Sequence, residues 1–534
     1  MGRIEHILAT APLKVAAGWV LAWASLAAVM PVDAGYDVLN YHLYIGWAAA
    51  EGRLATDLMP AGMHSWFNPL YSLFVEALID SLPAAGVSFV LGAIQALVFI
   101  ALYCLCRRVL AAAGFDSRTG AALVALGGFV SAWNLHMLAS IRNDHLTAGA
   151  FIAALLFIVR RDGAPAGWKG AAMGAFVTGL AVGLKLPGII FVAGFAAAVL
   201  VAVPGWAGRA KAVAAAGAAG LAGILLTGGW WFHVMWEHFG NPVFPMANGL
   251  FHAPLGPDRN FSDTRYLPRG ALDVLLYPLM GPFRPNEYPS PALQDFQIGL
   301  AYAGFAVLAF RLWKARAGQA EAPPRALLTV AAGALGTLAL WFAMFGVGRY
   351  ALGVWMLGPL LLVAALFTLK PAWAQAPRAA LWLAALAIAC LNCGLSVQVR
   401  RAPVADPLGA YVRVGAPEEI DFDHALVIFA GANPSAFLAR GLPGTATYTS
   451  LFPSDWTAPA VDKFRPLIRE RIDQARGPVI AVINTRSDVD RLIGGLHTYY
   501  GLEVNRADCR TIHTNFEGPE VGWMACPAQR RARA

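Results

Sequence analysis

The sequence has 534 residues, of which 58% are hydrophobic and 13% are charged, and its mean hydropathy is +0.55. Soluble domains carry about 25% charged residues, so this composition excludes an ordinary soluble enzyme. The formal net charge is +8. Lys and Arg nevertheless form short clusters beside apolar segments and no basic face, which excludes a nucleic-acid-binding protein.

Apolar segments with almost no charge recur along the chain, and most are long enough, at roughly 20 residues, to cross a bilayer core as helices. The first lacks a small-residue cleavage site, so we expect a retained helix. Lys185 and Pro187 leave open whether 170–203 forms two spans or one broken hairpin. We predict an α-helical polytopic membrane protein with about eleven spans, at residues 14–32, 86–106, 119–138, 146–159, 170–185, 187–203, 212–232, 297–312, 326–346, 350–369 and 379–397.

The positions of Lys and Arg predict how these spans are oriented, because cytoplasmic connections are enriched in both. With a cytoplasmic N-terminus, every connection on that side is short and basic. The opposite side then holds two long loops, 33–85 and 233–296, together with everything after about residue 400. We therefore expect a bacterial inner-membrane protein whose C-terminal part lies in the periplasm.

Composition changes after residue 400, which predicts a transmembrane catalytic domain over 1–400 and a small periplasmic α/β domain over 401–534. In the second domain, two short apolar runs bounded by Gly, Asn and Pro, 425–430 and 478–483, are typical of buried strands. Cys509 and Cys526 also lie there, in a compartment expected to be oxidising. They either form a disulfide or remain free thiols.

The first outer loop concentrates polar and aromatic side chains next to the membrane. It begins with Gly-Tyr-Asp37-Val-Leu-Asn-Tyr41-His42, and His64 and Asn68 lie near its other end. One interpretation is an interfacial belt, because Tyr and Trp favour that depth in any membrane protein. The other is a substrate-binding site.

Further polar residues lie at the predicted outer ends of other spans. Asp144 at the start of a span is also explained by helix capping, and Lys185 by extension of its ammonium group to the lipid interface. As candidates for substrate binding, in addition to Tyr41, His42, His64 and Asn68, we select Asn143, Lys185, Glu287, Arg349 and Tyr350.

The outer face therefore combines two carboxylates with several cations. A carboxylate can act as a general base or as an ion-pair partner. Arg and Lys can neutralise a departing phosphate. His42 and His64 lack the paired spacing with carboxylates that is typical of a metal site, so we expect no metal and no cofactor.

In this combination the sequence resembles the GT-C superfamily of integral-membrane glycosyltransferases. It is most similar to bacterial protein mannosyltransferase-like proteins and to the lipid A aminoarabinose transferases. The resemblance covers about residues 15–400. The motifs that carry it are the Asp37 segment, Asn68-Pro-Leu, Asp144, Gly-Leu-Ala-Val-Gly-Leu-Lys185, Gly240-Asn-Pro-Val-Phe-Pro245 and Gly348-Arg-Tyr350.

The resemblance implies a polyprenyl-phosphate sugar donor and an active site at the outer membrane face. It implies that Asp37 is the catalytic carboxylate, which deprotonates or orients the acceptor. Asp144 would be the second acidic residue of the catalytic site, supporting the acceptor or the first loop. Lys185 and Arg349 would be the partners of the donor phosphate. One motif departs from the family. Aminoarabinose transferases carry a Lys-Pro-Pro-type segment where this chain has Phe67-Asn68-Pro69, so the lysine expected to meet phosphate is absent there.

We therefore expect a glycosyltransferase that moves a sugar from this donor to a lipid, glycan or protein acceptor at the periplasmic face. A transporter or flippase of lipid-linked sugars is the first alternative, although it should place polar groups at mid-membrane. A polymerase or ligase of surface polysaccharide is the second. The sequence does not identify the sugar or the acceptor.

Overall fold

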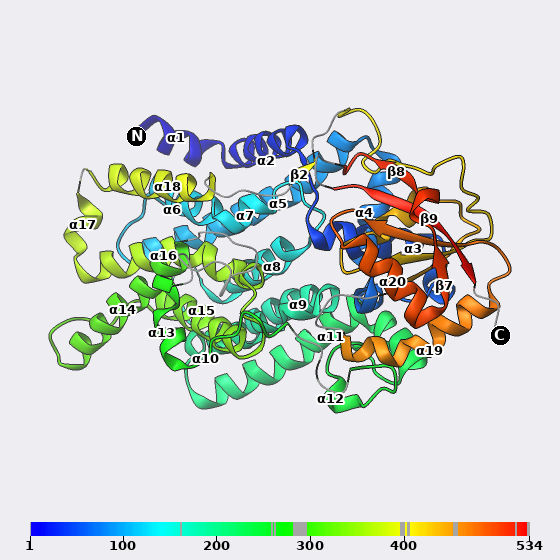
Figure 1. Cartoon of the computed structure of the whole chain (residues 1–534). Coiled ribbons are helices and arrows are strands. Elements are labelled where there is room, and N and C mark those ends of the chain that lie inside the picture. Colours follow the sequence, from blue (N-terminus) through cyan, green and yellow to red (C-terminus); the bar gives the residue numbers. More distant parts are fainter. Residues whose placement is uncertain are drawn as a thin grey trace.

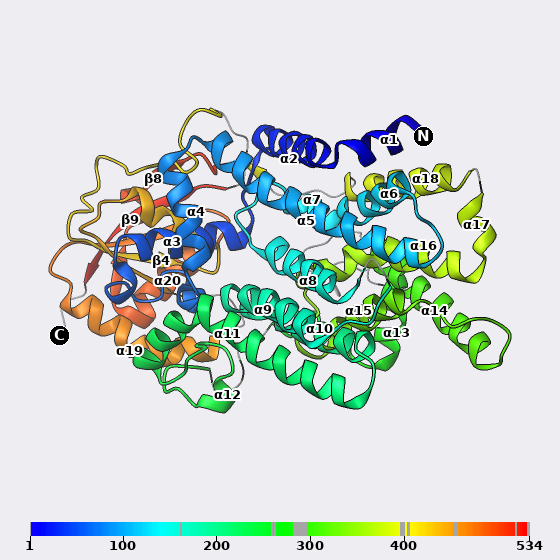
Figure 2. The same cartoon turned by 180° about the vertical axis from the view of Figure 1, so that it is seen from behind.

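The computed structural model describes residues 2–160, 163–257, 260, 263–280, 296–376, 378–395, 401–402, 406–451, 458–517 and 521–530. Long helices lie side by side over most of the molecule, and a β-sheet with its own helices lies at one end of them (Figure 1). The same separation is visible from behind (Figure 2). The sheet comes from the C-terminal residues, as the change in composition predicts.

The helical region is built mainly from apolar helices. Its long helices are α2 (Pro12–Val29), α5 (Ala84–Ala112), α6 (Arg118–Phe129), α8 (Asp144–Ile158), α9 (Trp168–Leu184), α10 (Ile189–Ala202), α11 (Trp206–Phe239), α14 (Gln297–Arg316), α15 (Arg325–Met344), α16 (Leu352–Leu369) and α18 (Ala379–Leu395). Its short helices are α1 (Gly2–Thr10), α7 (Ala132–His136), α12 (Asn248–Phe251), α13 (Ala271–Met280) and α17 (Pro371–Gln375).

Within the described residues, six helices are both long and apolar enough to cross a membrane, and four shorter apolar helices accompany them. One predicted span differs. The segment 119–138 is interrupted, because α6 ends at Phe129 and α7 begins at Ala132. The Ser131 side chain accepts a hydrogen bond from the Asn134 amide at 3.1 Å, and the Asn134 side chain donates to the Phe129 carbonyl at 2.8 Å. These bonds satisfy the backbone groups that the break exposes.

The segment 170–203 is two helices separated by the turn Leu186–Gly188. Proline in this turn removes a backbone donor, so a continuous helix is disfavoured there. The turn places Lys185 at the end of α9.

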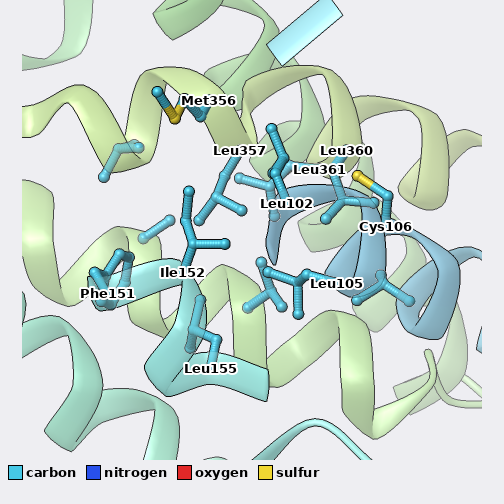
Figure 3. Close-up of a cluster of buried hydrophobic side chains, with 14 of the residues drawn as sticks. Leu102, Leu105, Cys106, Phe151, Ile152, Leu155, Met356, Leu357, Leu360 and Leu361 are labelled. Carbon is cyan, nitrogen blue, oxygen red and sulfur yellow. The ribbon is translucent and has the colours of Figure 1, made fainter. Parts of the chain in front are cut away.

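The core of the helical region forms where α5, α8 and α16 meet. Leu102, Leu105 and Cys106 of α5 pack there against Phe151, Ile152 and Leu155 of α8 (Figure 3). The α16 leucines complete the cluster, and all of these side chains are buried. Cys106 acts as a small apolar residue, as such cysteines commonly do.

The C-terminal region forms a seven-stranded mixed sheet with the order β3-β8-β9-β6-β4-β5, and β7 pairs with β9. Strands β4, β5 and β6 are parallel to one another, whereas β9 is antiparallel to β6. Both predicted strands are confirmed, as β4 and β6. Of the two possibilities left open for Cys509 and Cys526, the structure shows the disulfide. The strands are β3 (Val414–Gly415), β4 (Leu426–Ala430), β5 (Thr447–Leu451), β6 (Val479–Asn484), β7 (Leu502–Val504), β8 (Arg510–Thr514) and β9 (Trp523–Arg530).

The two faces of this sheet are covered by different parts of the chain. One face packs on α19 (Ala458–Gln474) and α20 (Val489–Tyr500) of the same region. The other packs on the first outer loop, which folds into the π-helical turn η1 (Val38–His42), α3 (Leu43–Ala50) and α4 (Leu70–Ser81). The loop and the tail thus share one hydrophobic core.

Polar contacts also hold the first outer loop against the outer edge of β5, the terminal strand of the sheet. Leu58 forms a parallel bridge with Thr449 and donates its amide to the Tyr448 carbonyl at 2.9 Å. The Asp57 carboxylate accepts the Tyr448 amide at 3.1 Å. Arg53 pairs with Asp57 at 2.9 Å, and its guanidinium also donates to carbonyl oxygens of the tail.

Candidate active site

A cavity of about 650 Å³ lies where the first outer loop meets the ends of the long helices. Its lining combines polar side chains with an apolar wall, which includes residues of α11 and of the segment 242–246. Of the predicted site residues, those that line the cavity are Asp37, Tyr41, His42, His64, Asn68, Asn143, Lys185, Arg349 and Tyr350.

Asp37 comes directly before the π-helical turn η1, which begins the first outer loop. Such turns are rare and occur frequently at functional sites. The approach to this turn is fixed by Asp33, whose carboxylate accepts the Gly35 amide at 2.8 Å. Asp37 contacts Arg349 Nη2 at 2.8 Å through its Oδ2. The predicted catalytic carboxylate is therefore ion-paired and lies at the cavity wall.

The backbone around Arg349 is held by two tryptophans. Trp341 donates its indole N–H to the Val347 carbonyl at 2.8 Å, and Trp355 donates to the Gly348 carbonyl at 2.7 Å. A Cβ added at Gly348 would lie 2.4 Å from the ring of Trp133, so only glycine fits there. These contacts fix the position from which the Arg349 side chain reaches the cavity.

Asp144 differs from the other predicted site residues because it does not line the cavity. Its side chain is 1% exposed and lies behind the two cations. Its carboxylate contacts Lys185 Nζ at 2.7 Å and Arg349 Nε at 3.7 Å. Asp37, Arg349, Asp144 and Lys185 therefore form a continuous chain of alternating charges. In this arrangement Asp144 holds the two cations at the cavity wall.

The charge states of the loop residues follow from their surroundings. Burial acts to raise the pKa of Asp37, but the guanidinium groups of Arg349 and Arg142 outweigh it and hold that pKa below its ordinary value. Burial, helped by the positive charge of Lys185, lowers the pKa of His42 to about 3. Burial also lowers the pKa of His64 to about 4. At neutral pH the site therefore holds an ionised Asp37 beside two neutral imidazoles.

Tyr41 contacts both histidines. Its ring stacks on His64 with the ring centres 4.9 Å apart, and it is tilted against His42 with the ring centres 4.4 Å apart. Among the described residues, no hydrogen-bond partner contacts either ring nitrogen of His42, which is buried and lines the cavity. The His42 ring is thus able to bind a hydroxyl group of a substrate.

Asn68 connects three elements. Its side-chain amide donates to the carbonyls of Gly183 at 2.7 Å and Thr227 at 2.9 Å, and its carbonyl accepts the Leu70 amide at 2.9 Å. Asn68 therefore joins the start of α4 to α9 and α11. Since both of its amide hydrogens are used, a structural role explains this residue.

Sequence reasoning missed a second ion pair at the same wall. The carboxylate of Asp33, which is fully buried, accepts hydrogen bonds from Arg142 Nε at 2.9 Å and from Ser140 at 2.6 Å. Arg142 lines the cavity and contacts His136 at 2.8 Å. Asp33 lies in β1 (Val32–Asp33), which pairs with Arg401–Ala402 at the start of the tail. The signal in the sequence was a second Asp only four residues before Asp37.

Sequence reasoning also missed the apolar wall of the cavity. Trp231, Met235 and Phe244 line it, and Trp231 donates its indole N–H to the Trp66 carbonyl at 2.9 Å. Glu287, a predicted binding residue, lies outside the described residues. In the part of the chain that the structure describes, no three His, Cys, Asp or Glu side chains are grouped to hold a metal ion.

Solved structures with a similar arrangement of elements are known. A crystal structure of ArnT from Cupriavidus metallidurans bound to undecaprenyl phosphate matches with a TM-score of 0.51 and 14% identity, over 97% of this chain and 98% of that one. A cryo-EM structure of the arabinofuranosyltransferase AftD from mycobacteria matches with a TM-score of 0.50 and 14% identity, over 97% of this chain and 40% of that one. At this low identity the two matches show a shared fold.

The expected GT-C resemblance is thereby confirmed for the fold, and it extends beyond residue 400 into the tail. No protein-family model matches the chain, and no curated protein matches it in sequence. The similarity is thus one of fold, and the chemistry of the cavity must be argued from its own residues.

Proposed function

We propose that this protein is a membrane glycosyltransferase that moves a sugar from a polyprenyl-phosphate donor to a hydroxyl group of an acceptor. The observation that carries the proposal is the cavity, which joins the Asp37–Arg349 pair and Lys185 to an apolar wall. A polyprenyl phosphate combines the same two properties, an anionic head and a long hydrocarbon chain. The ArnT structure with undecaprenyl phosphate supports this donor class.

In the proposed reaction the acceptor hydroxyl loses its proton to the Asp37 carboxylate and attacks the anomeric carbon. The bond from that carbon to the phosphate oxygen breaks, and the polyprenyl phosphate leaves with the electron pair. Attack opposite the leaving group inverts the anomeric configuration. Arg349 and Lys185 stabilise the charge that develops on the departing phosphate.

The Asp37–Arg349 contact makes proton transfer dependent on the donor. In the empty site the guanidinium stabilises the ionised carboxylate, so Asp37 is a weak base. A bound phosphate shares the Arg349 donors and weakens that contact. Asp37 is therefore a stronger base when the donor is present than when it is absent.

The test replaces Asp37 by Asn in the full-length protein and measures transfer from a labelled polyprenyl-phosphate sugar. Asn keeps the size of the side chain but cannot accept the proton, so we expect transfer to fall at least about 100-fold. The matched control is Asp490→Asn, at an exposed carboxylate of α20 that is paired with Arg506. Wild-type transfer by the Asp37→Asn protein, at equal expression, contradicts the proposal.

We further propose that the cavity opens on the periplasmic side of a bacterial inner membrane and that the N-terminus is cytoplasmic. The support is the basic composition of the short connections on the opposite side. A phosphatase reporter should be active when fused to the C-terminus and inactive when fused after Gln319, between α14 and α15. The reverse pattern of activity contradicts this orientation.

A further inference from the structure

The order in which the chain adds parallel strands to the sheet reverses at β4. The chain passes from β4 to β5 on one side and then crosses to β6 on the other side, because β4 pairs with both. The connections that leave β4 and β6 at their carboxyl ends therefore diverge. In open α/β sheets ligands bind in the crevice formed at such a point.

The carboxyl end of β4 lies at the candidate active site. Ala432, two residues after the end of β4, lines the same cavity as Asp37 and Arg349. The next residue, Asn433, donates a hydrogen bond through its side-chain amide to the hydroxyl of Ser487 at 2.9 Å. Ser487 lies in the connection after β6. An amide and a hydroxyl of the tail therefore meet at the carboxyl ends of β4 and β6, next to the residue that lines the cavity.

The neighbouring sheet edge argues against an extended peptide as the molecule that enters the crevice. A peptide would add as a strand beside β5, which is the terminal strand of the sheet. That edge is occupied, because Leu58 and Asp57 already pair with the backbone of Tyr448. The Ser450 hydroxyl also donates to the Met59 carbonyl at 2.7 Å.

We infer that the crevice at the carboxyl ends of β4 and β6 is the acceptor subsite and that it binds the hydroxyl groups of a saccharide. The inference rests on the proposed function. Asn and Ser side chains donate and accept hydrogen bonds, which suits sugar hydroxyls. The saccharide enters past Ala432 and presents one hydroxyl to Asp37, while the donor occupies the apolar side of the cavity.

The test compares two Ala→Trp variants of the full-length protein. Ala432→Trp places a large side chain at the cavity mouth, whereas Ala507→Trp places the same side chain at an exposed site in the turn Arg506–Asp508 of the same domain. Donor-site binding is measured with undecaprenyl phosphate as the probe. Transfer from labelled undecaprenyl-phosphate sugars is titrated separately with a glycolipid fraction of bacterial membranes and with water-soluble oligosaccharides released from it.

We expect Ala432→Trp to raise the KM for the accepted fraction at least about tenfold and to change the affinity for undecaprenyl phosphate less than about twofold. Ala507→Trp should match the wild type in both measurements. The fraction that is used distinguishes a lipid-linked from a free saccharide. Asn433→Ala, a smaller change, should raise the same KM and so tests the inference if Ala432→Trp does not fold.

Three results have distinct meanings. An unchanged acceptor KM in both the Ala432 and the Asn433 variants overturns the subsite. Wild-type protein that binds undecaprenyl phosphate but transfers to neither saccharide fraction overturns the saccharide acceptor. A failure of the wild-type protein to bind undecaprenyl phosphate contradicts the proposed function, and the acceptor subsite that rests on it is then rejected as well.

Discussion

Arg349 contacts both predicted carboxylates, and this double contact sets the electrostatics of the site. The chain Asp37–Arg349–Asp144–Lys185 has two negative and two positive groups. Its charges are buried or nearly so, and such groups are tolerated only when they are paired. An arriving phosphodiester adds one negative charge to this balanced set. The cations can then exchange part of their contact with the carboxylates for contact with the ligand.

The pH dependence of transfer follows from these charges. The pKa of Asp37 lies below its ordinary value of 3.8, and the pKa values of His42 and His64 are about 3 and 4. The free enzyme therefore keeps an ionised Asp37 and neutral histidines from pH 5 to 8, and none of the three titrates in that range. We expect kcat/KM to stay constant between about pH 5 and 8 as far as these groups control it. An acid limb centred near pH 6.5 that disappears in His42→Gln shows instead that His42 titrates in the free enzyme.

The sequence predicts this site only in part, and particular residues show why. Asp37, Lys185 and Arg349 are polar groups at the ends of apolar segments, so they can be recognised from the sequence alone. The Asp33–Arg142 pair joins residues 109 positions apart, and nothing local indicates that they meet. Asn68 occurs in a motif of the expected family, yet its hydrogen bonds to α9 and α11 depend on helices that the motif does not encode.

Among the elements, the turn Gly348–Ala351 before α16 determines where the Arg349 guanidinium lies. Trp341, Trp355 and Trp133, which belong to three different helices, hold this turn in place. The backbone of Gly348 packs directly against the ring of Trp133. Hydropathy predicted the spans that flank this turn. It did not predict the break at Val130 and Ser131, because short polar side chains such as Ser131 hardly alter the mean hydropathy of a segment.

Gly348→Ala should displace this turn. The new Cβ would lie 2.4 Å from the Trp133 ring, so the backbone or the ring must move and the Arg349–Asp37 contact lengthens. We expect transfer to fall at least about tenfold, because small displacements in a catalytic site are costly. The control is Gly18→Ala in α2, where an added Cβ meets nothing within 4 Å. Equal activity of the two variants shows that the turn has room to adjust.

At the scale of the whole molecule, the tail is docked on the loop that carries Asp37. Besides the β5 edge, α4 contributes a buried contact, since Arg440 of the tail pairs with Glu76 at 2.9 Å. Arg440 also pairs with Asp80. Composition identified the tail as a separate region with its own strands. The shared core with the first loop could not be predicted, because it joins segments at opposite ends of the chain.

The stability of this docking should depend on pH through Glu76. Burial raises its pKa to about 7, from an ordinary value of 4.5, although Arg440 opposes the shift. The folded protein thus holds a proton that the unfolded chain releases, so the contribution of Glu76 to stability is fully present below about pH 4.5 and is lost as pH rises through about 7. We expect the thermal unfolding midpoint to show this decline, and Glu76→Gln to weaken it. The control is Glu418→Gln, at an exposed carboxylate of the tail. A decline of the same size in the Glu76→Gln variant and the wild type contradicts the assignment.

The bridge between Leu58 and Thr449 also has a consequence for how the protein is made. Met59 and Ser450, the neighbouring contact, are 391 residues apart. A ribosome delivers the first loop early and the β5 strand near the end of synthesis. Until then the Asp37 loop lacks its contacts with the tail, and afterwards it covers the exposed edge of the new sheet, which would otherwise promote aggregation. Docking of the tail on the catalytic loop and protection of the β5 edge are therefore a single event.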